Sequence, residues 1–199
     1  QMCIRDRYWF DLACSLSLEA LGGNITPLDD LVVKAKHHNG QNISSQHFQS
    51  ALRDSYLLNN KTKTVQDPLS FRTATLIHGA AYDSLSYVEE QLLLELESSD
   101  DNPMVDIDNQ RILSTPHFET LNVSLAIEML NVALSHVSNA SIQRMIKLGN
   151  PDFTGLSRFL IADEHQYFGL QALQKTAATL DVEIPVSYTH LTLPTKRIV

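Results

Sequence analysis

Apolar residues recur along much of the chain at the three- and four-residue spacing of an amphipathic helix. Five apolar residues follow this spacing between positions 123 and 137: Val123, Ile127, Leu130, Leu134 and Val137. A second set does so within 76–97: Ala81, Leu85, Val88, Leu92 and Leu96. Each set lines one face of a long helix, and each apolar stripe needs a partner to cover it.

Shorter helices are predicted before these two. An apolar segment runs from Trp9 to Leu21 and ends at a pair of glycines, a common helix stop. Thr26-Pro27 then reads as an N-cap followed by proline in the first turn, which predicts a helix to about His37.

Two further helices and one pair of strands complete the expected elements. Ser45 is a candidate cap for a helix that buries Phe48, Leu52 and Tyr56, and the last helix is expected over about 157–180. Only 104–113 suggests strands, as a short hairpin with Asp108-Asn109 at its tip. The sequence therefore predicts an all-α bundle of long helices with one short β-hairpin near 104–113.

Both ends of the chain look foreign to this pattern. QMCIRDR (1–7) and VSYTHLTLPTKRIV (186–199) resemble translated adapter peptides, so the helical domain is expected to span 8–185. The chain has a formal net charge of −8 and the two tails contribute +3, so the remainder carries −11. Such an acidic segment is not expected to bind nucleic acid or an anionic membrane surface.

No metal site or disulfide framework is predicted. Cys3 lies in a tail, so Cys14 has no partner, and a reducing, cytoplasmic setting is expected. The carboxylate-rich stretch 97–111 fails as a calcium loop, because Val105 and Arg111 stand where an EF-hand needs glycine and glutamate. Three histidines have no ligand spacing and are read as surface residues: His37, His38 and His47.

The stretch VQDPLSFRT (65–73) carries the most chemistry. Pro68 disfavours helix at Asp67 and can open the next helix, which Asp67 could cap. Gln66 and Arg72 are then expected to face one pocket at the start of that helix, where a guanidinium suits a carboxylate ligand. The alternative is an ordinary helix start whose arginine pairs with a nearby Asp or Glu.

Several motifs together resemble the aromatic amino acid ammonia-lyase family, which includes histidine, phenylalanine and tyrosine ammonia-lyases. They follow one another in the family's order: VQDPLSFR (65–72), HGA (78–80), SDDNPM (99–104) and TPHFE (115–119), ahead of a long helix over 121–148. The resemblance covers most of 8–185 and implies a helical bundle of the fumarase/aspartase-like type.

The resemblance also implies a reaction, a prosthetic group and an assembly. Family members eliminate ammonia from an aromatic amino acid to give an α,β-unsaturated acid, using a methylidene-imidazolone formed from Ala-Ser-Gly, in homotetramers with shared active sites. By position, Arg72 matches the carboxylate binder and Gln66 a residue near the substrate and prosthetic group. Phe118 matches an aromatic beside that group, and Leu69 occupies a substrate-pocket position.

Departures from the family pattern leave alternatives open. Leu69 replaces a pocket tyrosine, His117 and Glu119 flank Phe118 in place of asparagine and histidine, and no Ala-Ser-Gly occurs in the sequence. The chain is therefore expected to be a central fragment, inactive alone, with no certain catalytic residue of its own. Its parent is either a working lyase or a divergent member, such as an aminomutase or a helical scaffold without catalysis.

Overall fold

The computed structural model describes residues 2–59, 64–161 and 168–187. Its long helices are α1 (Met2–Leu21), α3 (Asn39–Ala51), α5 (Ala74–Leu96), α6 (Leu121–Leu148) and α8 (Gln171–Ser187). The short ones are η1 (Thr26–Leu28), α2 (Asp30–Lys34), η2 (Tyr56–Leu58), α4 (Leu69–Arg72), α7 (Pro151–Thr154) and η3 (Arg158–Leu160). The expected all-α bundle is confirmed.

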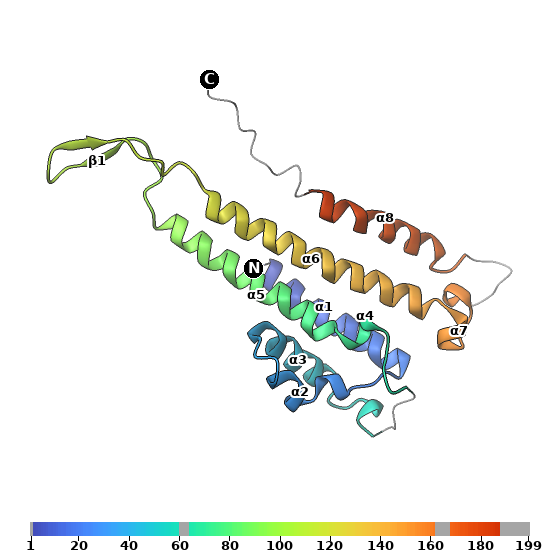
Figure 1. Cartoon of the computed structure of the whole chain (residues 1–199). Helices are drawn as coiled ribbons and strands as arrows, with labels where there is room; N and C mark the ends of the chain where they lie inside the picture. Colours follow the sequence, from blue (N-terminus) through green and yellow to red (C-terminus); the bar gives the residue numbers. More distant parts are fainter. Residues whose placement is uncertain (1, 60–63, 162–167, 188–199) are drawn as a thin grey trace.

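The two longest helices, α5 and α6, lie side by side and form the spine of the bundle (Figure 1). Helix α8 packs along α6, and α1 and α3 pack on α5. Among the described residues, α6 is the one helix long and apolar enough to cross a membrane by length and composition. Here it is a packed helix of the bundle, with contacts to both α5 and α8.

The apolar stripes predicted on α5 and α6 meet over only part of their length. Ala81 of α5 packs with Ala133 and Val137 of α6, and these small side chains let the helix backbones approach. Towards the C-terminal end of α5 the leucines are exposed, including Leu92 and Leu96 of the predicted stripe. This part of the stripe is only partly covered by the described residues.

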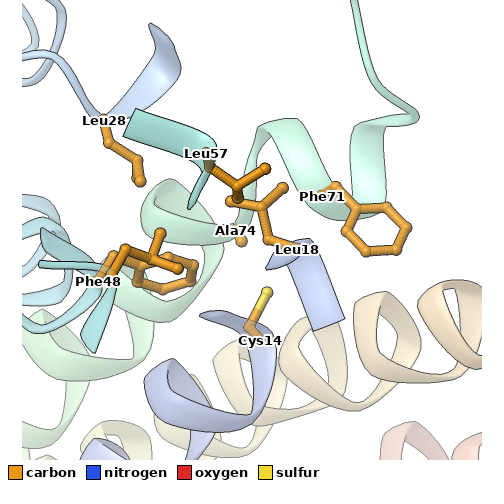
Figure 2. Packing of buried hydrophobic residues seen from close by; sticks show 8 residues of the cluster. Cys14, Leu18, Leu28, Phe48, Leu57, Phe71 and Ala74 are labelled. Atoms are coloured by element: carbon orange, nitrogen blue, oxygen red, sulfur yellow. The ribbon is translucent and has the colours of Figure 1, made fainter. Parts of the chain in front are cut away.

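The main core lies where α1, α3, α4 and α5 meet (Figure 2). Its buried members are Cys14, Leu18, Leu28, Phe48, Leu52, Leu57, Phe71 and Ala74. Phe71 is the contribution of α4, so this one-turn helix is anchored in the core by a fully apolar side chain.

The hairpin is confirmed and the helix over 26–37 is not. Strands β1 (Met104–Asp106) and β2 (Arg111–Leu113) pair antiparallel, with Met104 opposite Leu113. In place of one helix after Thr26, η1 and α2 are separated by Asp29, whose backbone is extended and whose carboxylate accepts the Leu31 N–H at 2.8 Å. Asp29, rather than Thr26, is therefore the N-cap here.

The predictions for Ser45 and Tyr56 are wrong. Ser45 lies inside α3 and is buried, because that helix begins six residues earlier, at Asn39. A side chain of α5 binds a free backbone N–H in the first turn of α3: the Asp83 carboxylate accepts the Gly40 N–H at 2.7 Å. Tyr56 is exposed, and its hydroxyl donates to the Glu19 carbonyl at 2.6 Å.

The last helix also begins later than predicted. α8 starts at Gln171, because Phe159 and Leu160 take left-handed backbone angles that interrupt a helix over 157–180. At the other end of the chain, the backbone of 2–7 belongs to α1. Whether the tails 1–7 and 186–199 are foreign to the domain stays a prediction.

Candidate functional site

The turn before α4 is held by Asp67, although not as a helix cap. Pro68 occupies the N-cap position of α4, and no side-chain bond caps this helix. The buried Asp67 carboxylate instead accepts the Asn24 N–H at 2.6 Å and the Thr64 hydroxyl at 2.7 Å. The predicted capping role of Asp67 is therefore wrong, and its bonds fix the turn to a loop 43 residues away in sequence.

That loop, residues 22–26, approaches the turn closely. The Asn24 side chain donates to the Val65 carbonyl at 3.0 Å. A Cβ at Gly23 would lie 2.9 Å from a carboxylate oxygen of Asp67 and closer still to Leu18, so any larger residue here would displace these two side chains. The backbone on both sides of Gln66 is thus restrained by α1 and the loop that follows it.

Gln66 and Arg72 line one pocket, as predicted. It has a volume of about 380 Å³, and Asn24, Gln41 and Thr75 contribute polar groups to its wall. No carboxylate within the described ranges forms an ion pair with Arg72. Among the described residues, Arg72 therefore does not form the ion pair with Asp or Glu that the alternative interpretation predicted.

Leu69 and Phe118 lie outside this pocket. Leu69 is 62% exposed and lines a second hollow, of about 300 Å³, on the side of α4 that faces α6. Phe118 is 59% exposed and lies beyond the other end of α5. Because α5 has 23 residues it is about 35 Å long. Arg72 comes just before its first residue, whereas Phe118 comes after its last and just before α6. Within one chain, two of the four predicted site residues share a pocket.

A buried polar cluster joins α1, α3 and α5. At its centre is Asp11, which is fully buried and accepts from Ser44 at 2.6 Å. The Nδ1 atoms of His47 and His78 each lie 2.8 Å from its oxygens, and the Tyr82 hydroxyl also donates to it. His47, predicted to be a surface residue, is half-buried and belongs to this cluster, whereas His37 and His38 are exposed.

Burial and hydrogen bonding shift the pKa values of this cluster. Burial alone would raise the pKa of Asp11, but the bonds from His78, Ser44 and Tyr82 outweigh it and lower that pKa. Burial lowers the pKa of His78, against the attraction of Asp11. Its Nε2 is buried with no hydrogen-bond partner, so a second ring proton would have no acceptor.

The position of Asp11 in the sequence already indicates a buried carboxylate. Asp11 lies three residues before Cys14 and seven before Leu18, on the face of α1 that enters the core. A carboxylate on such a face needs buried donors. Among the described residues no group of three or more His, Cys, Asp or Glu side chains is arranged to hold a metal ion.

Sequence comparison places these features in a known context. A family model described as aromatic amino acid lyase matches residues 6–190. Histidine ammonia-lyase of Stigmatella aurantiaca is 35% identical over 175 residues, which cover 87% of this chain and 34% of that protein. The chain thus spans about a third of the length of this curated relative.

Solved structures agree with the sequence comparison. Ergothionase from Treponema denticola, an ergothioneine-degrading enzyme, is 36% identical with a TM-score of 0.85, over 92% of this chain and 37% of that one. Histidine ammonia-lyase from Trypanosoma cruzi is 27% identical (TM-score 0.79; 90% and 33% covered). Phenylalanine aminomutase from Pantoea agglomerans is 26% identical (TM-score 0.79; 93% and 40% covered). The chain belongs to the aromatic amino acid lyase family.

Proposed function

We propose that this chain is part of an ammonia-lyase that removes ammonia from an aromatic L-amino acid to leave an α,β-unsaturated acid. The candidate substrates are histidine, tyrosine and phenylalanine. One observation carries the proposal: Arg72 lines a pocket beside Gln66 with no carboxylate partner among the described residues. A half-buried guanidinium of this kind is available to a ligand.

The two side chains have complementary roles in this proposal. The guanidinium of Arg72 donates two parallel hydrogen bonds to the substrate carboxylate and so orients the amino acid. The Gln66 amide both donates and accepts, so it can bond a second polar group at the same end of the substrate. The volume of about 380 Å³ falls in the range of small-molecule pockets.

The prosthetic group of the family has to come from outside this sequence. When present, a methylidene-imidazolone supplies the electrophile that makes the amino group a leaving group. Its Ala-Ser-Gly source does not occur in the 199 residues, and Phe118 lies outside the pocket that Gln66 lines. Of the two residues matched to this group, Gln66 is the one whose position in the pocket fits it. We therefore expect the fragment alone to be inactive.

A site shared between copies accounts for the distant residue. Phe118 does not line the pocket of Arg72, and α5, about 35 Å long, lies between the two segments that carry them. If Phe118 contributes to the same reaction as Arg72, we propose that it comes from another copy of the chain. The exposed leucines near the C-terminal end of α5 supply an apolar surface for such an assembly. We propose a homotetramer. We also propose a cytoplasmic location, since Cys14 is a free, buried thiol.

Ergothioneine is a second candidate substrate. The likeness to the ergothioneine-degrading enzyme, at 36% identity and a TM-score of 0.85, exceeds the likeness to the histidine ammonia-lyase structure, at 27% and 0.79. The likeness to the aminomutase structure, at 26% identity, supports a further alternative, in which the parent enzyme moves the amino group instead of eliminating it. All three chemistries begin by binding an amino acid or betaine carboxylate, the role assigned to Arg72.

A substrate panel on the full-length protein tests the proposal. Histidine, tyrosine, phenylalanine and ergothioneine would each be incubated with it, and the conjugated product acid followed by its ultraviolet absorbance. The variant Arg72→Ala should raise KM by about a hundredfold, as loss of a charged hydrogen-bonded pair predicts. An unchanged KM would show that Arg72 is not the carboxylate clamp, and no product from any of the four would contradict the lyase assignment.

A further inference from the structure

Arg144 is a buried cation whose bonds lead to the candidate site. It belongs to α6 and is 5% exposed. Its Nη1 donates to the carbonyl oxygen of Ser70 at 2.9 Å, across 74 positions of sequence, and its Nη2 donates to the Ser141 hydroxyl at 2.8 Å. The guanidinium thus bridges the C-terminal part of α6 and the one-turn helix α4.

The guanidinium of Arg144 is unusual because it is a buried charge with only neutral hydrogen-bond acceptors among the described residues. Arginine stays protonated in proteins, and a buried charge is normally compensated by an ion pair. Within the parts of the chain that the structure describes, no carboxylate forms an ion pair with Arg144, and both of its hydrogen-bond acceptors are neutral. The planar guanidinium nevertheless fixes the direction of its bonds, which a flexible ammonium would not.

The segment that Arg144 holds is a single helical turn. α4 comprises four residues, Leu69–Arg72, and no side chain caps its start. Phe71 anchors it in the core and Asp67 ties down the preceding turn. Phe71 holds α4 in the core, and the bond from Arg144 to the Ser70 carbonyl ties the same helix to α6. Arg72 lies two residues from that bonded carbonyl.

We infer that Arg144 is a positioning residue, which sets the direction in which Arg72 presents its guanidinium to a substrate carboxylate. The inference rests on the proposed function, in which Arg72 is the carboxylate clamp. Loss of the Ser70 bond lets α4 turn, and displacements of about 1 Å are enough to cost a bound substrate up to about a hundredfold in rate. Arg144 itself would touch no substrate.

Ligand binding by the full-length protein separates positioning from stability. The probes are urocanate, cinnamate and 4-coumarate, each with its primary carboxamide, and the readout is the ratio of the acid Kd to the amide Kd by calorimetry. A general loss of stability would weaken both probes alike and leave the ratio unchanged. Arg72→Met should abolish the preference for the acid, and Arg144→Met should reduce it by about tenfold or more. Arg53→Met, at an exposed arginine, is the matched control and should stay within about twofold of wild type.

Two milder variants decide the matter if Arg144→Met does not fold. Arg144→Lys keeps the charge with a less directional donor, and Ser141→Ala removes the second acceptor; each should lower the acid preference by about threefold. The inference is overturned if Arg72→Met loses the preference while every folded Arg144 and Ser141 variant keeps it within about twofold. If Arg72→Met itself keeps the preference, the proposed clamp fails first, and that result is distinguishable from the other.

Discussion

Replacing Asp11 by alanine should destabilise the fold more than any surface change. The substitution removes a carboxylate that is fully buried and leaves Ser44 and His78, both buried, without the acceptor at 2.6 and 2.8 Å. Each stranded buried donor costs about 1 to 3 kcal/mol. Two buried donors are stranded, so we expect Asp11→Ala to lower the free energy of unfolding by about 2 to 6 kcal/mol.

Urea unfolding followed by circular dichroism at the helix band measures this change. Asp108→Ala, at an exposed hairpin position, is the matched control and should stay within about 0.5 kcal/mol of wild type. A cycle with His78→Ala should give a coupling energy of about 1 kcal/mol or more, because the two residues share one hydrogen bond. A loss below about 1 kcal/mol for Asp11→Ala would refute the claim that this carboxylate organises the cluster.

Three further changes probe other features of the fold. Gly79→Ala would place a Cβ 2.4 Å from the Gln41 backbone nitrogen, so α3 and α5 must separate. The free energy of unfolding, measured in urea, should fall by about 2 kcal/mol or more. An unchanged free energy of unfolding would contradict the close contact. Because burial lowers the pKa of His78, the unfolded chain binds its proton more tightly, and the free energy of unfolding should fall as pH drops below about 6.5. His78→Asn should make that fall shallower; an equal slope would assign it to other groups. Burial raises the pKa of Cys14 to about 11, so iodoacetamide at pH 8 should modify this thiol in urea but not in the native protein, as peptide mass mapping would report.

Local sequence patterns predicted the long helices and the hairpin. Helices α5 and α6 follow from unbroken apolar periodicity over many turns, and the hairpin from turn residues at Asp108-Asn109. The break between η1 and α2 depends on which of two polar residues, Thr26 or Asp29, becomes the N-cap. Both choices satisfy the same local rule, so sequence alone does not decide between them.

The start of α3 and the role of Asp67 depended on contacts that local rules do not contain. Asp83 accepts the Gly40 N–H in the first turn of α3, and Asp67 accepts the Asn24 N–H. In each case the two partners lie 43 positions apart in sequence. In the candidate site, the shared pocket of Gln66 and Arg72 could be predicted, because these residues lie six positions apart on either side of a proline that starts a helix. The other polar groups of that wall, such as Gln41, come from distant elements and carry no local motif.

The uneven support along α5 and α6 has a dynamic consequence. The start of α5 packs against α1 and α3 around a buried core. The last turn of α5, by contrast, carries the exposed Leu96 and leads into the two-stranded hairpin (Figure 1). Local opening is easiest where few buried contacts must be broken. In the isolated chain, amide hydrogens of the last turns of α5 and the first turns of α6 should therefore exchange with deuterium well before those flanking Phe71 and Ala74.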